Sequence, residues 1–166
     1  MVDAVDLITA AWREQCPDVD VAPMEVVGRI TRLARVLDRE LREFFTGHGL
    51  ERWEFDMLAT LRRSGGDQGL TPGALIKAAM ITSGAVTNRI DRLESKGLVR
   101  RNSDPGDRRS VRIQLTAAGR TMVDELLPRH VANENRLLAD LSAADRDHLT
   151  ALLRTLSESL GDTTLT

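Results

Sequence analysis

The chain has 166 residues, of which 42% are hydrophobic, and a formal net charge of −2 at pH 7. This length is enough to bury one substantial core, so we expect one compact domain. No apolar run approaches the roughly 20 residues that cross a bilayer, and the acidic N-terminus lacks the basic flank of a secretory signal. These features predict a cytoplasmic protein with no membrane partner.

Catalytic and metal-binding patterns are not found in the sequence. The single cysteine, Cys16, has no second cysteine to form a disulfide and no neighbouring ligands at metal-site spacing. The histidines lie outside any Ser- or Cys-containing catalytic motif, and Ser64-Gly65-Gly66 lacks the lysine that a phosphate-binding loop requires. We therefore expect no cofactor, no metal and no enzymatic activity.

The N-terminal half of the chain is predicted to be helical. Residues 1–22 contain a short amphipathic helix, and residues 24–46 form a long helix with one apolar seam at spacings of three and four. Further helices are expected over residues 51–63, 71–79 and 83–96. Thr71 and Pro72 mark the start of the 71–79 helix, because threonine caps a helix and proline fits its first turn. The apolar spacing of these three helices is expected to turn inward the side chains of Trp53, Met57, Leu58, Leu61, Leu75, Ile76, Ala79, Val86, Ile90 and Leu93.

A β-hairpin is predicted after these helices. The short strands 98–101 and 111–115 flank a turn-rich, arginine-bearing loop. Helices over 116–140 and 142–160 complete the chain, the last opened by a capping box of Ser142 and Asp145. The predicted fold class is mainly α with a small β-hairpin wing.

The predicted elements define three regions. Residues 1–22 are an N-terminal extension helix, and residues 51–115 are a winged helix-turn-helix. Residues 24–46 and 116–161 are a helical dimerisation region, because their apolar seams exceed what one short chain can cover. We therefore expect a homodimer.

Positive charge is concentrated around the expected hairpin. Residues 82–112 carry eight Lys or Arg and four Asp or Glu, a net charge of +4, which leaves −6 for the rest of the chain. Two short helices joined by a tight turn and followed by a basic hairpin place a helix N-terminus and an arginine loop on one surface. This arrangement is typical of DNA-binding proteins.

The outward face of the 83–96 helix supplies groups that read bases. Asn88 suits adenine and Arg92 suits guanine in the major groove, while serine and threonine bind bases or phosphates. A solvated polar face is the alternative for this helix alone, but the adjacent wing favours DNA binding. The DNA-binding candidates are Ser83, Thr87, Asn88, Arg92, Arg108 and Arg109.

The segment Thr82–Arg101, followed by Asp107-Arg108-Arg109 and Leu115-Thr116, resembles the MarR family of bacterial transcriptional regulators. The family's wing pattern, Asp-x-Arg, five residues and then Leu-Thr, is met by Asp107, Arg109, Leu115 and Thr116. The resemblance implies an intertwined homodimer that binds a palindromic operator in double-stranded DNA. It also implies that the 83–96 helix enters the major groove and the wing arginine the minor groove.

A narrower resemblance is to the urate-responsive branch of that family, on Trp12 and the segment Trp53–Arg63. It implies an effector pocket formed by Trp12, Asp56, Arg63 and Arg89. Asp56 and Arg63 are seven residues apart, so they lie on one helix face about 10 Å apart. We expect a small anionic effector, such as urate, a purine or a carboxylate, that disturbs an Asp56–Arg89 ion pair and releases a repressor from DNA.

Less specific explanations exist for the same residues. The helix dipole alone favours an aspartate near a helix start and an arginine near its end, and Trp12 also serves as a hydrophobic peg. Cys16 allows an oxidation-sensing regulator of the same fold, although the chain lacks the tyrosines that surround the cysteine in such regulators. A helical protein-interaction module whose wing binds an acidic partner is a further alternative.

Overall fold

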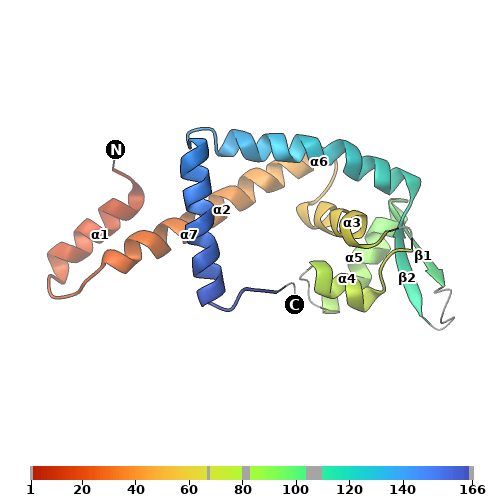
Figure 1. Cartoon of the computed structure of the whole chain (residues 1–166), viewed down its shortest axis with the longest axis horizontal. Helices are drawn as coiled ribbons and strands as arrows, with labels where there is room; N and C mark the ends of the chain where they lie inside the picture. Colours follow the sequence, from red (N-terminus) through yellow and green to blue (C-terminus); the bar gives the residue numbers. More distant parts are fainter. Residues whose placement is uncertain (1, 67, 80–82, 104–109, 165–166) are drawn as a thin grey trace. The chain divides into compact units, whose positions relative to one another are not determined.

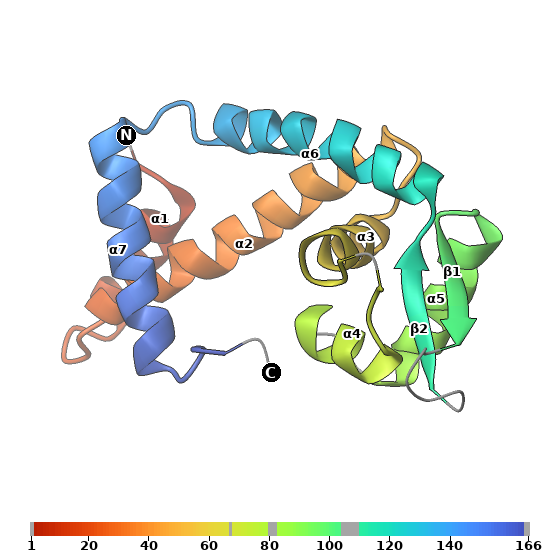
Figure 2. The same ribbon diagram turned by 45° about the vertical axis from the view of Figure 1, so that its right-hand side comes forward.

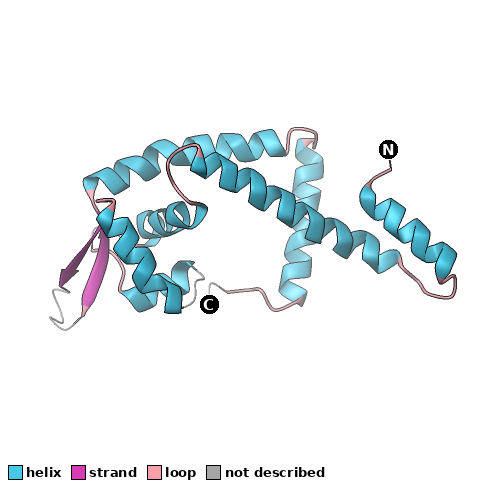
Figure 3. Cartoon of the chain, turned by 180° about the vertical axis from the view of Figure 1, so that it is seen from behind, coloured by secondary structure: helices cyan, strands magenta, loops and turns pink. Residues whose placement is uncertain are grey.

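The computed structural model describes residues 2–66, 68–79, 83–103 and 110–164 (Figure 1). The chain divides into two compact units, Met1–His48 and Gly49–Thr166, which are described separately below. Most of the described residues are helical, and the strands form one hairpin (Figure 3). Among the described residues, none of the helices combines the length and apolarity that a membrane crossing requires.

The first unit consists of helices α1 (Ala4–Gln15) and α2 (Ala22–Thr46). A capping box of Asp3 and Asp6 opens α1. The guanidinium of Arg29 on α2 binds the carboxylates of Asp3 at 2.8 Å and Asp6 at 2.5 Å, which ties the two helices together. Helix α2 begins two residues earlier than predicted, because Pro23 occupies its first turn, where a missing N–H costs nothing.

The second unit begins with the predicted winged helix-turn-helix: α3 (Arg52–Ser64), α4 (Pro72–Ala79), α5 (Ser83–Ser95), β1 (Val99–Ser103) and β2 (Val111–Leu115). The strands are antiparallel, with Val99 opposite Leu115 and Ser103 opposite Val111 (Figure 2). The first strand runs two residues further than the expected 98–101, because its pairing with β2 extends that far.

A backbone bridge between Leu70 and Ile113 attaches the segment before α4 to β2, which the sequence did not predict. The bridge requires glycine at position 69. Its φ is 72°, and a Cβ there would lie 2.1 Å from the carbonyl oxygen of Ile113. The approach of these two segments closes one side of the winged helix.

The core of the second unit lies beneath the winged helix. Its buried apolar side chains come from every one of the elements α3 to β2 and from the first turns of α6, and they include Met57, Leu58, Leu61, Leu75, Val86, Ile90, Leu93, Val99, Ile113 and Val123. Most of the predicted inward residues of α3, α4 and α5 are among them. Trp53, Ile76 and Ala79 were also predicted to face inward, but they are only half-buried.

Helices α6 (Ala117–Leu137) and α7 (Ala143–Ser159) end the second unit. Helix α6 runs through Pro128 without interruption. The predicted capping box of Ser142 and Asp145 is present at the start of α7. No residue of α7 is buried, so its apolar stripe remains exposed to solvent in this chain.

Candidate DNA-binding surface

Helix α5 presents a polar face to solvent. Its apolar stripe of Val86, Ile90 and Leu93 is buried, which fixes the orientation of the helix. Thr87 and Asn88 are therefore exposed on the opposite side. Exposed polar side chains of a helix are the ones that can reach base edges in a major groove.

Three of the DNA-binding candidates have no described side-chain position. The side chain of Ser83 and the whole of Arg108 and Arg109 lie outside the residues that the structure describes. The strands on either side of the last two are described, so the ends of the hairpin loop are placed beside each other. Their roles therefore remain predictions.

Arg92 is exposed, as expected, but it is held by residues of α3. Its guanidinium lies 5.0 Å from the centre of the Trp53 ring and forms an ion pair with Glu51. Arg89, one turn earlier, lies 5.2 Å from the same ring. The Trp53 indole N–H donates to the Glu51 carboxylate at 2.5 Å.

The contacts with Arg92 and Trp53 favour the ionised form of the Glu51 carboxyl. Hydrogen bonds from Arg92 and Trp53 lower the pKa of Glu51. Glu51 was not predicted from the sequence as a site residue, and Trp53 was predicted to face the core. The available signal was weak: a tryptophan in the first turn of a helix, two residues after a carboxylate.

Three further ion pairs anchor α5. Lys96 Nζ lies 2.7 Å from the fully buried carboxylate of Glu54 on α3. Arg101 on β1 pairs with Asp91 at 2.5 Å and with Glu94, both on α5. These contacts fix α5 against α3 and against strand β1.

These pairs also reduce the charge available to DNA. Glu51 and Glu54 lie outside residues 82–112 in sequence but pair with cations inside that segment. Including both acids lowers the local net charge from +4 to +2. The sequence count therefore overestimated the positive charge of this surface.

Three of the four effector candidates belong to the second unit. Asp56 on α3 pairs with Arg52, one turn earlier, at 3.9 Å. Arg63 Nη2 donates to the carbonyl oxygen of Ala78 at 3.4 Å, and so reaches the last turn of α4. The expected Asp56–Arg89 ion pair is not formed within the described part of this unit, because the Arg89 guanidinium is engaged with the Trp53 ring.

Asp56 has an unusual electrostatic environment. The surrounding protein desolvates its carboxyl and raises the pKa of Asp56, although 57% of the side chain is still exposed. The positive charges of Arg52, His130 and Arg89 oppose that rise. Arg89 therefore acts on Asp56 through its charge.

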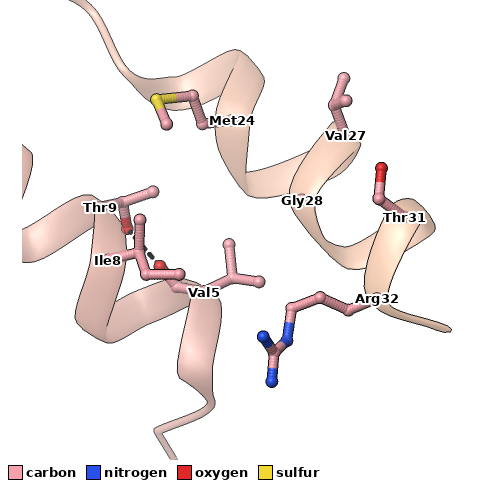
Figure 4. A pocket seen from close by; sticks show the side chains of 8 residues that line it. All are labelled: Val5, Ile8, Thr9, Met24, Val27, Gly28, Thr31 and Arg32. Atoms are coloured by element: carbon pink, nitrogen blue, oxygen red, sulfur yellow. Dashed lines mark hydrogen bonds between the residues drawn. The ribbon is translucent and has the colours of Figure 1, made fainter. Parts of the chain in front are cut away.

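The fourth candidate, Trp12, is on α1 in the first unit and is 47% exposed. That unit contains a cavity of about 340 Å³ between α1 and α2 (Figure 4). Its walls are mainly apolar and are lined by Val5 and Ile8 on α1 and by Met24 and Val27 on α2. Trp12 is not among the described residues that line it.

Neither a thiol site nor a metal site stands out. Cys16 is half-buried at the end of α1, where its backbone N–H donates to the Trp12 carbonyl at 2.8 Å. Within the described ranges, no group of three His, Cys, Asp or Glu side chains is placed to hold a metal ion.

The helices α4 and α5, followed by the β1–β2 hairpin, define a winged helix-turn-helix protein. A family model described as MarR family matches residues 48–110. The HTH-type transcriptional regulator PecS of Dickeya dadantii is 41% identical over 153 residues, 92% of this chain and 92% of PecS.

Solved structures give the same result. A mutant of MarR from E. coli complexed with operator DNA matches with a TM-score of 0.69 and 26% identity, over 87% of this chain and 96% of MarR. BpsR of Bordetella bronchiseptica, whose DNA binding is regulated by 6-hydroxynicotinic acid, matches with a TM-score of 0.67 and 29% identity, over 79% and 92% of the two chains. This chain belongs to the MarR family of transcriptional regulators.

Proposed function

We propose that this chain is a homodimeric repressor that binds a palindromic operator and is released by a small anionic effector. The observation that carries the proposal is helix α5, whose buried stripe turns Thr87 and Asn88 outward beside the wing strands. The similarity to MarR, which was solved with operator DNA, supports the same use of this surface.

The homodimer is supported by apolar side chains that the chain leaves uncovered. On α2 these include Val27 at 62% exposure and Leu33 at 57%, and on α7 they include Leu152 at 56%. Surfaces of this kind mark protein–protein interfaces. A twofold dimer presents two copies of α5, which matches a palindromic operator with half-sites one helical turn apart.

The effector site is proposed to use Asp56, Arg63 and Arg89 of the second unit, while Trp12 of the first unit stays a candidate from the sequence. The planar guanidinium of Arg63 suits a delocalised anion, because it donates two parallel hydrogen bonds. An anion beside Asp56 repels its carboxylate and attracts the Arg89 guanidinium of α5 away from the Trp53 ring. The recognition helix then shifts, and operator affinity falls by a typical allosteric factor of about 5 to 150.

One relative supports an aromatic carboxylate effector. The DNA binding of BpsR is regulated by 6-hydroxynicotinic acid, an aromatic carboxylic acid. This favours a planar anion over a bulky or cationic ligand for the proposed site.

The DNA-binding roles are tested by titration at several salt concentrations. The double variant Arg108→Ala/Arg109→Ala is expected to weaken binding and flatten its salt dependence, because these arginines are assigned to the DNA backbone and minor groove. Asn88→Ala is expected to reduce discrimination between operator and random DNA by about 1–3 kcal/mol. Equal losses on both DNAs in both variants would contradict this division of roles.

The effector site is tested by calorimetry with urate, 6-hydroxynicotinic acid and citrate. Arg63→Ala is expected to retain DNA binding and lose both effector binding and release. Arg62→Ala is the matched control, because the Arg62 guanidinium is instead paired with Asp124 at 2.8 Å. Undiminished effector affinity in Arg63→Ala would contradict the proposed pocket.

A further inference from the structure

Residues at the start of α3 contact two arginines of α5. Glu51, which precedes the first turn of α3, pairs with Arg92. The guanidinium groups of Arg89 and Arg92 lie 5.2 Å and 5.0 Å from the centre of the Trp53 ring. The hydrogen bond from Trp53 to Glu51 joins the two α3 residues. We call Glu51 and Trp53 together the α3 clamp.

The carboxylate in this clamp offers Arg92 what a DNA phosphate offers. Both are delocalised anions that accept parallel hydrogen bonds from a guanidinium. Arg92 is four residues after Asn88, so the two side chains lie on the same face of α5. When α5 lies in a groove of DNA, the Arg92 guanidinium therefore lies on the helix face that meets the DNA.

The ion pair is open enough to be exchanged. The side chains of Arg92 and Glu51 are 47% and 51% exposed, so water and ions reach both. Exposed pairs of this kind contribute little stability and are screened by salt. By contrast, the neighbouring Lys96–Glu54 pair has a fully buried carboxylate and stays within the protein.

We propose that Glu51 is an internal competitor for DNA phosphate at Arg92. In the free protein Glu51 holds Arg92 against Trp53, and in the DNA complex a phosphate takes the place of the carboxylate. Arg89 keeps its contact with Trp53, so the ring remains attached to α5 throughout. This proposal rests on the DNA-binding function proposed above and adds a residue of α3 that sets its strength.

The competition has a measurable salt signature. Salt screens the exposed Glu51–Arg92 pair, so the cost of separating the pair falls as the salt concentration rises. In the unmodified protein this falling cost offsets part of the affinity that DNA binding loses to salt. Removing the charge of Glu51 should therefore make the salt dependence of DNA binding steeper.

The test uses the full-length protein and a mixed-sequence DNA duplex of about 30 base pairs, titrated by fluorescence anisotropy at several salt concentrations. Glu51→Gln is expected to bind about 3- to 10-fold tighter at low salt, with a steeper log–log salt slope, because this advantage fades as salt screens the Glu51–Arg92 pair of the unmodified protein. Glu125→Gln on α6 is the matched control, since it removes the same charge from an exposed position. It is expected to leave the slope unchanged.

A second substitution tests the partner. In the Arg92→Gln background, Glu51→Gln should change neither affinity nor slope, because the contested guanidinium is absent. Weaker binding by Glu51→Gln alone would show that Glu51 orients Arg92 toward DNA instead, and would overturn the competition. An unchanged slope would also overturn it.

The outcomes separate this proposal from the one it rests on. If the unmodified protein binds DNA and only the Glu51→Gln slope fails to change, the clamp is rejected and the DNA-binding function stands. If neither protein binds any duplex, the DNA-binding function is rejected, and the competition with it. The fluorescence emission of Trp53, measured in a Trp12→Phe background, checks that Glu51→Gln leaves the ring in contact with Arg89 and Arg92.

Discussion

The winged helix and helix α7 use the same kind of apolar residue in opposite ways. In the winged helix, Leu58 and Leu75 are 0% exposed and are covered by the chain itself. On α7, Leu152 and Leu153 are 56% and 42% exposed, although they recur at ordinary helical spacing. Apolar periodicity therefore identifies a helix face that needs cover, but it does not say which chain supplies the cover.

The largest effect is expected from charges on the exposed stripe of α7. Leu152→Glu/Leu156→Glu should convert the proposed dimer into monomers, because each leucine buried at the proposed interface is worth about 1.5–3 kcal/mol and the pair therefore more than 100-fold in dissociation constant. Light scattering after size exclusion measures the mass. Thr150→Glu, at an exposed polar position of the same helix, is the control and should remain dimeric.

The core of the winged helix should respond as an ordinary protein interior. Leu75→Ala is expected to lower the free energy of unfolding by about 2–5 kcal/mol, because it leaves a cavity among residues that cannot fully collapse. Urea unfolding gives the value, and the mass in solution should stay that of the dimer. A loss below about 1 kcal/mol would mean that this position is not packed as described.

A smaller effect is expected where α5 is anchored to α3. Lys96→Met removes the cation that faces the fully buried Glu54 carboxylate, and an unpaired buried charge should cost roughly 1–3 kcal/mol. Lys77→Met, on the exposed side of α4, is the matched control. Equal melting temperatures for the two variants would show that Glu54 does not depend on Lys96.

The smallest effect concerns Asp56. Its raised pKa means that the ionised carboxylate is less favourable in the folded protein than in the unfolded chain. That cost is absent at low pH and appears as the pH rises from 3.8, the usual pKa of an aspartate, through the raised pKa of Asp56. Asp56→Asn should therefore melt slightly higher than the unmodified protein at pH 7, and the difference should vanish near pH 3.

Melting curves across this pH range check the sign. Asp147→Asn, at an exposed position on α7, is the control and should show no such pH-dependent gain. A lower melting temperature for Asp56→Asn at pH 7 would indicate that the Arg52 and Arg89 charges outweigh the desolvation.

Local signals account for what the sequence predicted correctly. Ser142 and Asp145 open α7 through a hydrogen-bonding pattern that spans only four residues. Pro72 begins α4, and the alternation of Val111 to Leu115 identifies β2. Each of these features depends on neighbours in sequence, so one chain was enough to find it.

Contacts between distant residues explain what the sequence did not predict. Glu51 and Arg92 are 41 residues apart, and Leu70 meets Ile113 across a similar interval, so neither pairing leaves a local pattern. Trp53 was predicted to face inward because its helical spacing matches that of Met57 and Leu61. In the structure Trp53 is half-buried, and two guanidinium groups of α5 lie 5.2 Å and 5.0 Å from the centre of its ring.

The central claim is that two copies of this winged helix read one palindrome, and selection from a random duplex library tests it most directly. Binding as a twofold dimer predicts enrichment of inverted repeats whose half-sites are centred about 10 base pairs apart. It also predicts that Leu152→Glu/Leu156→Glu loses that enrichment. Enrichment of isolated half-sites by the unmodified protein, or no enrichment at all, would contradict it.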